Sequence, residues 1–329
     1  MYDFEIDRVV GIIRENNYRT VGLQFPEGLK EHAPEVVDEI NKKVDCSIII
    51  SADPCHGACD LADGDMELIG VEALFHFGHS KILKKTGIPV FYIEARSDVD
   101  PISLLSEHLE KLPKRVGLVT TIQHVHTLNK VKRFLEDKGF EVHIGKAKGR
   151  AKYDGQVLGC NFACAKEISE LVDGFIYTGT GNFHPLGVAL ATRKKTFAFD
   201  LLLNEVRDME DFKDRILKQR FAQIEKAMNA ETFGIIVGEK RGQARKNLAL
   251  KIKRKLEVHG KKAYLIYLNE IDPGTLMPFR KLDAFVNTAC PRVTIDEAKR
   301  YKQALLTPNE LDIMLGEERW ENYRMDEIP

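Results

Sequence analysis

The chain has 329 residues, of which 43% are hydrophobic and 30% charged, and its net charge is −1. This composition is typical of a soluble globular protein, and the balanced charge excludes a global attraction to nucleic acid or to an anionic membrane. No apolar run approaches the roughly 18–20 residues of a transmembrane helix, and the acidic N-terminus lacks the apolar segment of a secretory signal. We therefore expect a cytoplasmic protein with room for two or three domains and with no membrane or direct nucleic-acid partner.

Strands and helices alternate along the chain, which is typical of a parallel α/β architecture. The pattern occurs three times, so we expect three related units of about one hundred residues rather than one continuous sheet. In each unit a first strand is followed by a helix and a second strand. The first strands are predicted at 19–25, 114–120 and 231–237, the helices at about 30–43, 124–138 and 243–258, and the second strands at about 47–52, 141–145 and 263–268.

The third strands share a pattern: an acidic residue, a small residue, an apolar pair and a polar exit. They are predicted at 72–79, 173–180 and 283–290, and the fourth strands follow at 89–94, 196–200 and about 304–307. We therefore predict an α/β fold of three related domains, each with a parallel sheet of about four strands flanked by helices. The predicted domains are 1–110, 111–228 and 229–329, the last with a C-terminal tail.

Two further stretches suggest no chemical role. Residues 239–257 carry eight basic and two acidic side chains, which a solvated helix face explains. The C-terminal tail holds the only tryptophan, and we expect Trp320 and Tyr323 to pack against a neighbouring unit.

Six cysteines, at positions 46, 55, 59, 160, 164 and 290, carry the functional prediction. Their even number permits disulfides, but a reducing compartment opposes them, so metal binding or catalysis is the better interpretation. Cys59, Cys160 and Cys290 each lie in a loop at the carboxyl side of a strand, one in each predicted unit. Open α/β sheets bind ligands at such loops. If the units pack around a pseudo-threefold axis, the three thiols meet at its centre.

Three thiolates from three domains suit an iron–sulfur cluster in which one iron has no protein ligand. The open position could bind a substrate directly, as in catalytic zinc sites. Zinc is the alternative metal, because Cys55 with Cys59 and Cys160 with Cys164 could form a four-thiolate site. Small buried core cysteines are a second alternative. The CxxxCxxC signature of ordinary radical S-adenosylmethionine enzymes is absent.

Other polar residues follow the strands near these cysteines, and we predict that they bind the cofactor. The glycine turns beside them lack the spacing of a dinucleotide fingerprint or a P-loop. At each position a structural role is as compatible with the sequence as a functional one. The predicted cofactor-binding residues are Gln24, His76, His79, Gln123, His184 and Gln243.

Five short motifs, in their order and spacing, resemble those of a known family. They are Leu23-Gln-Phe-Pro-Glu-Gly-Leu29, Gly57-Ala-Cys-Asp60, His76-Phe-Gly-His-Ser80, Gly155-Gln-Val-Leu-Gly-Cys160 and Cys290-Pro-Arg292. Over essentially its whole length the chain resembles the diphthamide synthase family, the archaeal 2-(3-amino-3-carboxypropyl)histidine synthases. The resemblance implies a homodimer of three-domain chains and a 4Fe-4S cluster held by Cys59, Cys160 and Cys290. Because Cys55 and Cys164 lie beside matched ligands, the choice within each pair stays open.

The same resemblance implies a reaction. The 3-amino-3-carboxypropyl group of S-adenosylmethionine moves by noncanonical radical chemistry to one histidine of translation elongation factor 2, and methylthioadenosine is released. An electron donor protein is a further implied partner. Two alternatives stay open: a quinolinate synthase-like enzyme, whose cluster acts as a Lewis acid, and a noncatalytic electron-transfer subunit.

Overall fold

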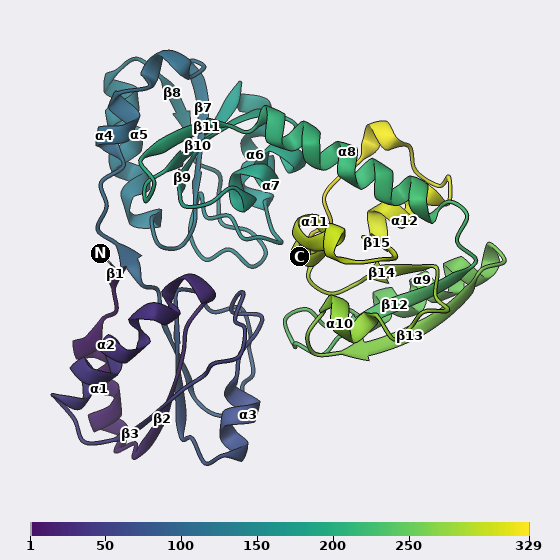
Figure 1. The fold of residues 1–329 in the computed structure, drawn as a ribbon. Helices are drawn as coiled ribbons and strands as arrows, with labels where there is room; N and C mark the ends of the chain where they lie inside the picture. The colour runs from purple at the N-terminus through teal and green to yellow at the C-terminus, as the bar shows by residue number, and fades with distance from the viewer. Residues whose placement is uncertain (1, 329) are drawn as a thin grey trace.

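The protein, described here by a computed structural model of residues 2–328, has three parallel sheets arranged as three lobes (Figure 1). In each sheet the second strand of the predicted unit lies at one edge, followed by the first, third and fourth. The first sheet has the order β3 (Ser47–Ile50), β2 (Thr20–Gln24), β4 (Ala73–Phe77) and β5 (Val90–Ile93). The second has the order β8 (Glu141–His143), β7 (Arg115–Thr120), β9 (Gly174–Gly179) and β10 (Lys195–Asp200). The third has the order β13 (Lys262–Leu268), β12 (Thr232–Gly238), β14 (Ala284–Asn287) and β15 (Ala304–Leu306).

The shared strand order confirms the predicted fold class. Every predicted strand is present, and the pairs within each set of four are parallel. The structure adds β11 (Glu205–Asp208), antiparallel to β10, and a short antiparallel pair, β1 (Tyr2–Asp3) with β6 (Arg96–Ser97). The two-residue strands β1 and β6 are too short to show alternation, and β11 has no buried residue and so lacks the apolar run that marks the other short strands.

Helices flank the sheets and connect their strands. The α-helices are α1 (Ile6–Asn16), α2 (Ala33–Asn41), α3 (Asp63–Leu68), α4 (Ile102–Ser106), α5 (Leu128–Asp137), α6 (Ala163–Ile168), α7 (Phe183–Thr192), α8 (Glu210–Ala227), α9 (Lys246–Val258), α10 (Pro273–Leu276), α11 (Pro291–Glu297) and α12 (Pro308–Met314). Short 3-10 helices cover Glu27–His32, Leu109–Lys111, Val125–Thr127, Ser169–Leu171, Ala298–Arg300 and Trp320–Asn322. Within these described residues, no helix has both the length and the apolar character needed to cross a membrane.

All three predicted helices begin later than expected. The one predicted from residue 124 starts as a 3-10 helix at Val125–Thr127, and α5 begins at Leu128. The one predicted from residue 30 starts as a 3-10 helix, and α2 begins at Ala33 with Pro34 in its first turn, where a missing backbone N–H costs nothing. The one predicted from residue 243 starts at Lys246, because residues 239–245 form a loop that reaches the first lobe.

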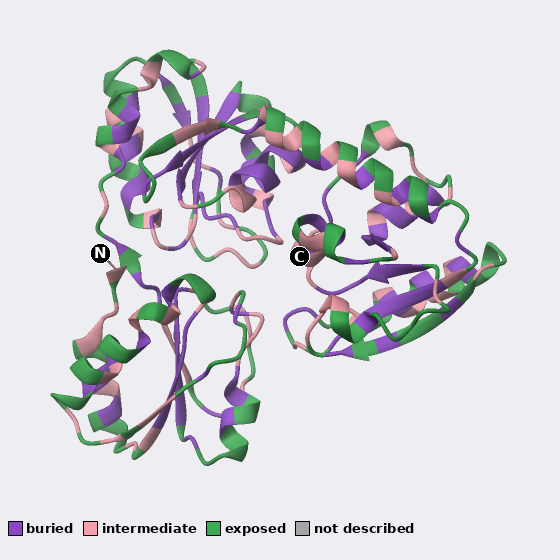
Figure 2. Cartoon of the chain, in the orientation of Figure 1, coloured by how far each residue is buried: buried purple, intermediate pink, exposed green. Residues whose placement is uncertain are grey.

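The core follows the sheets. Figure 2 shows buried residues along the strands and on the inner faces of the helices, with exposed residues outside. The central strands β4 and β9 are buried along their whole length, as expected for parallel strands covered on both faces. In the first lobe, the rings of Phe25 and Phe77 stack with their centroids 4.3 Å apart.

Helix α8 connects the second and third lobes and packs on both. It contacts α7 on one side and β15 and α12 on the other. Its buried Arg220 donates to Glu310 at 2.7 Å and to the carbonyls of Thr294 and Leu305 at 2.8 and 2.7 Å. A buried cation with this many acceptors is stable because its desolvation is compensated. The domain limits 1–110, 111–228 and 229–329 stay a prediction, and α8 lies at the last of them.

The two stretches without an assigned chemical role behave differently. Trp320 and Tyr323 pack in the apolar core beside the second sheet, as expected for the tail. The basic stretch is only partly a solvated face. Its α9 residues Lys251 and Arg254 are exposed, but the side chain of Lys240 is covered by contacts with Asp60 of the first lobe and Glu270 of the third. The prediction failed there because Asp60 is 180 residues away in sequence.

Candidate metal centre

The loops that carry the predicted ligands leave the carboxyl ends of the three sheets and face a common centre (Figure 1). Cys59 lies between β3 and α3, and Cys160 lies between β8 and α6. Cys290 follows β14 and immediately precedes α11, whose first residue is Pro291. Parallel strands place their loops at one edge of the sheet, so each lobe contributes one thiol to the centre.

The three thiols are free and half-buried, and they influence one another. Burial raises the pKa of Cys160 to about 12, with further contributions from the nearby thiols of Cys59 and Cys290. Burial, followed by the charge of Cys59, raises the pKa of Cys290 to about 11. Burial also raises the pKa of Cys59. These thiols are therefore protonated without a metal, and a metal centre that binds them would displace their protons and stabilise the thiolates.

Side-chain contacts connect the three loops. Gln243, in the loop after β12, donates its Nε2 to Cys59 Sγ at 3.3 Å. Gln243 also lines a cavity of about 120 Å³ together with Cys290. Gly159, beside Cys160, packs so closely on Arg292 that an added Cβ would lie 2.9 Å from its Cδ.

The backbone of the Cys59 loop is packed just as tightly. At Gly242, an added Cβ would lie 2.3 Å from Cys59 Cβ, and the Gly242 N–H donates to the Cys59 carbonyl at 3.3 Å. Gly57 lies against Cys59 Sγ, with 3.3 Å to an added Cβ, which agrees with the expected close approach of small residues. Lys240 binds Asp60 at 2.7 Å and so holds the loop after Cys59 against the third lobe.

Arginines surround the thiols. Arg150 lowers the pKa of both Cys59 and Cys160, and its Nη1 donates to the Gly242 carbonyl at 2.6 Å. Arg292 lowers the pKa of Cys290 and lies 4.0 Å from the centroid of the Phe183 ring. These cations favour thiolates at the centre, and they favour a net negative group bound there.

Arg245 and the C-terminal tail support the same loops. Arg245 donates to the carbonyls of Thr288 and Ala289, directly before Cys290, at 2.6 and 3.1 Å. It also binds Asp326. In the tail, the Ile328 N–H donates to the Cys160 carbonyl at 2.9 Å. The tail therefore lies between the second and third lobes and fixes the backbone of two of the three predicted ligands.

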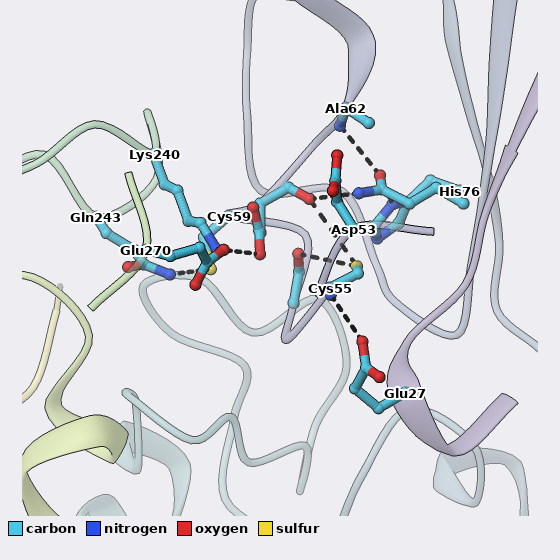
Figure 3. Close-up of polar contacts among 12 residues, drawn as sticks. Glu27, Asp53, Cys55, Cys59, Ala62, His76, Lys240, Gln243 and Glu270 are labelled. Carbon is cyan, nitrogen blue, oxygen red and sulfur yellow. Dashed lines mark hydrogen bonds and ion pairs between the residues drawn. The ribbon is translucent and has the colours of Figure 1, made fainter. Parts of the chain in front are cut away.

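Cys55 and Cys164, the other members of the two pairs, lie outside the group of three thiols, although Cys55 is near enough to Cys59 for their charges to interact. Cys164, on α6, packs in the core of the second lobe and its Sγ contacts the Gln156 carbonyl at 3.2 Å. Cys55 is buried on the other side of the β3–α3 loop from Cys59 (Figure 3). Cys46 precedes β3 and is half-buried at the edge of the first core.

Three of the six predicted cofactor-binding residues form one internal network. Gln24 donates to the Asp60 carbonyl at 2.8 Å and accepts from the Ala62 N–H at 3.2 Å and from His76 Nδ1 at 2.8 Å. His76 Nε2 lies 3.0 Å from His79 Nδ1. Burial holds the pKa of His76 well below its ordinary value, and burial with the nearby His56 lowers that of His79 to about 4. Both imidazoles are therefore neutral at physiological pH.

The other three lie in different surroundings. Gln123 donates to the Gly78 carbonyl at 2.7 Å and joins the first and second lobes. His184 stacks on Tyr177, and burial together with the positive Arg292 lowers its pKa to about 3. Gln243 alone contacts a predicted ligand.

Sequence reasoning did not identify Arg150, Gly242, Arg245 or the tail as neighbours of the centre. Each acts through backbone contacts with distant loops, for which a single sequence carries no periodic signal. Arg292 and Lys240 had weak signals: the first belongs to the Cys-Pro-Arg motif and the second to the basic stretch.

Within residues 2–328, the only three His, Cys or acidic residues whose ligand atoms all lie within 4.8 Å of one another are Cys55, His76 and His79. The three thiols of the centre are thus spread more widely than a single ion with bonds of about 2.3 Å to sulfur would hold them. A polynuclear cluster spans such a separation.

Comparison with known proteins gives a consistent result. Residues 25–324 match the family model for diphthamide synthesis proteins. The 2-(3-amino-3-carboxypropyl)histidine synthase of Pyrococcus horikoshii is 38% identical over 313 residues, which cover 94% of this chain and 89% of the relative. Subunit 1 of the Schizosaccharomyces pombe synthase is 31% identical, over 99% of this chain and 76% of the relative.

A solved structure agrees over the whole fold. The crystal structure of Dph2 from Pyrococcus horikoshii with a 4Fe-4S cluster matches with a TM-score of 0.90 and 36% identity, covering 100% of this chain and 95% of that one. The chain therefore belongs to the diphthamide synthesis protein family and is a transferase of the 3-amino-3-carboxypropyl group.

Proposed function

We propose that this protein carries out the first step of diphthamide biosynthesis by moving the 3-amino-3-carboxypropyl group of S-adenosylmethionine to a histidine of translation elongation factor 2. Family membership supports the reaction class. The observation that carries the proposal is the meeting of three free thiols, one from each lobe, at the carboxyl ends of the sheets. No single loop could supply that arrangement.

We further propose that Cys59, Cys160 and Cys290 hold a 4Fe-4S cluster and leave one iron without a protein ligand. The donor set fits: three thiolates spread more widely than a single ion allows, with arginines nearby to balance a negative group. When bound, the cluster supplies one electron at low potential. The crystal structure of the Pyrococcus relative, which has the same fold, contains a 4Fe-4S cluster.

In this proposal, the residues of the chain bind S-adenosylmethionine and orient it toward the cluster. The cavity beside Cys290 is lined by His56, Lys240, Gln243 and Arg292 among others, and its polar lining suits the charged methionine part of S-adenosylmethionine. Of the predicted cofactor contacts, Gln243 lies against Cys59, and His184 is near enough to Arg292 for that cation to lower its pKa. Gln24 and Gln123 act indirectly in this proposal, by holding the loops through internal hydrogen bonds.

In the proposed reaction, the bonds, electrons and protons balance. The C–S bond on the methionine side breaks after uptake of one electron, giving methylthioadenosine and a 3-amino-3-carboxypropyl radical. A C–C bond forms to the imidazole carbon, the imidazole loses its proton, and one electron is returned. Placement of the reacting atoms within about 3–3.5 Å decides which C–S bond breaks, so orientation by this cavity is the protein's main contribution.

The decisive experiment is an anaerobic reaction of the reconstituted protein with dithionite, S-adenosylmethionine and archaeal elongation factor 2. Mass spectrometry should find one histidine heavier by a 3-amino-3-carboxypropyl group, and chromatography should find methylthioadenosine. Stoichiometric 5′-deoxyadenosine without methylthioadenosine would refute the mechanism. An unmodified elongation factor, rescued only by adding a related subunit, would favour an electron-transfer role, and turnover of quinolinate precursors would favour the Lewis-acid alternative.

We also propose that the protein works as a homodimer in the cytoplasm and receives its electron from a donor protein. These proposals rest on the family resemblance. Light scattering of the reduced protein should give twice the mass of the 37.4 kDa chain. A purely monomeric species with full activity would contradict the dimer.

A further inference from the structure

A second group of metal-binding side chains lies beside the proposed cluster centre. Cys55 Sγ and one ring nitrogen each of His76 and His79 lie within 4.8 Å of one another. Cys55 belongs to the β3–α3 loop, His76 to β4, and His79 to the turn after it. Figure 3 shows Cys55 and His76 on the side of this loop that faces away from Gln243 and the Cys59 sulfur.

Hydrogen bonds fix the orientation of His76 as a ligand requires. Gln24 donates its Nε2 to the Asp60 carbonyl and accepts the Ala62 N–H on its Oε1, so its amide cannot be turned around. Its Oε1, 2.8 Å away, therefore accepts the Nδ1–H of His76. The lone pair is then on His76 Nε2, which points toward His79. Metal-binding histidines commonly donate their other ring N–H to an oxygen in this way.

In the metal-free protein His76 Nε2 accepts a hydrogen bond from His79 Nδ1–H at 3.0 Å. A metal ion would replace that proton with only a small movement of the two rings, because two tetrahedral zinc–nitrogen bonds span about 3.3 Å. Cys55 Sγ has only long contacts, with the carbonyls of Gly57 at 4.0 Å and Asp60 at 3.9 Å. The Cys55 backbone N–H is held by Glu27 at 3.2 Å, so Sγ would approach the ion by rotation of the side chain and a shift of the adjoining residues 52–54, which are exposed.

We propose that Cys55, His76 and His79 bind one divalent transition-metal ion of the zinc class, with a fourth position open to water. One thiolate and two imidazoles suit zinc and exclude magnesium or calcium, which prefer oxygen. The ion joins the loop that carries Cys59 to the end of β4 and so fixes one wall of the cluster centre. For His76 and His79 this role replaces direct cofactor binding.

Cobalt(II) is the probe, because thiolate–cobalt charge transfer and visible bands report a tetrahedral site. The full chain with Cys59→Ser, Cys160→Ser and Cys290→Ser removes the competing thiols. Anaerobic titration of this metal-free variant should saturate at about one cobalt per chain, with the spectrum of a single thiolate. Adding Cys55→Ala should abolish the charge-transfer band, and adding His79→Gln should weaken binding by at least about tenfold.

Cys164→Ala in the same background is the matched control, because Cys164 is equally buried and distant from the histidines. It should leave the cobalt spectrum unchanged. In the wild-type protein carrying its cluster, elemental analysis should find about one zinc per chain, and Cys55→Ala should lose the zinc but keep the iron. Circular dichroism of each variant tests folding, and Cys55→Ser replaces Cys55→Ala if the latter does not fold. A charge-transfer band that survives without Cys55, or no band in the parent variant, would refute the site.

Discussion

The two Cys-x-x-x-Cys pairs have the same spacing but opposite surroundings. In the first pair both cysteines lie in the β3–α3 loop, Cys59 beside Gln243 and Cys55 beside two histidines. In the second pair Cys160 lies in the loop and Cys164 lies on α6, facing the apolar core of the second lobe. Spacing alone therefore says little about a cysteine's role. The role of each cysteine depends on the residues from other helices, strands and loops that surround it.

The two cysteine loops are also held in place by different sets of contacts. The Cys59 loop is held by contacts with the third lobe, from Gly242 and Lys240. The Cys160 loop is held by its own helix, by the tail at Ile328 and by Arg292 of the third lobe, against which Gly159 packs. Both loops thus depend on the third lobe, but the Cys160 loop is also held by the tail and by α6, which packs in the apolar core of its own lobe.

The largest expected effect comes from removing a thiol of the centre. Cys59→Ala, Cys160→Ala and Cys290→Ala should each lose the cluster and lower activity by more than about 100-fold, since even outer-shell changes at metal sites cost about 10- to 100-fold. Iron and sulfide counts with electron paramagnetic resonance of reduced samples measure this. Cys46→Ala and Cys164→Ala should retain iron. Normal spectra in two of the three variants would show that the site does not have three protein ligands.

Two glycines test the mechanical difference between the loops. At Gly145 an added Cβ would lie 1.9 Å from the Cys164 carbonyl oxygen, so Gly145→Ala should displace α6 and cost about 3 kcal/mol of unfolding free energy, the upper part of the range for overpacking. At Gly242 the clash is with Cys59 itself. Gly242→Ala should therefore reduce iron content and lower activity by as much as about 100-fold, the effect of a 1 Å displacement.

Denaturant unfolding and iron analysis of both variants distinguish these outcomes. Gly64→Ala is a control, because no atom lies within 4 Å of an added Cβ at that position. It should change neither quantity. Equal iron loss in Gly145→Ala and Gly242→Ala would mean that the two loops depend on packing between lobes to the same degree.

The strands and the three cysteines of the centre could be predicted from the sequence, but the contacts that distinguish the two cysteine loops could not. The strands were predictable because parallel strands buried on both faces give short apolar runs, and the three cysteines stood out by their place after those runs. The lone pair on His76 was not predictable, because it depends on Gln24, whose orientation depends on two backbone groups near residue 60. Likewise Gly242 lies against Cys59 across 183 residues, which no local pattern encodes.

A smaller effect is expected at the contact between the first and second lobes. Burial acts to raise the pKa of Glu94, but hydrogen bonds from Lys152, Tyr153 and Arg96 outweigh it and leave the pKa below its ordinary value of 4.5. A lowered carboxyl pKa stabilises the folded state above 4.5, and this stabilisation is lost as the pH falls through the lowered value. Glu94→Gln should cost about 1 kcal/mol at neutral pH, discounted because Lys152 is half-exposed.

Urea unfolding across this pH range provides the check. The difference between wild type and Glu94→Gln should be full at neutral pH and should shrink below pH 4.5. Glu136→Gln, on the exposed surface of α5, is the matched control and should show a smaller difference. If the difference for Glu94→Gln grows as the pH falls, then the pKa of Glu94 is raised and not lowered in the folded protein.

The smallest effect is expected for Cys164, the buried partner in the second pair. Cys164→Ala removes one sulfur from the core and its contact with the Gln156 carbonyl, and the new residue has a better helix propensity on α6. The loss of the buried sulfur destabilises the fold, and the better helix propensity of alanine partly offsets that loss. The free energy of unfolding should therefore fall by about 1 kcal/mol, near the lower end for core truncation. The Cys164 side chain packs in the apolar core of the second lobe, where its Sγ contacts the Gln156 carbonyl, and it does not belong to the group of three thiols or to the group of Cys55, His76 and His79. Iron content, zinc content and activity should therefore equal those of the wild type. If Cys164→Ala loses iron while Cys160→Ala keeps it, then Cys164 and not Cys160 is the cluster ligand. That result would also require α6 to be oriented differently in the cluster-bound protein.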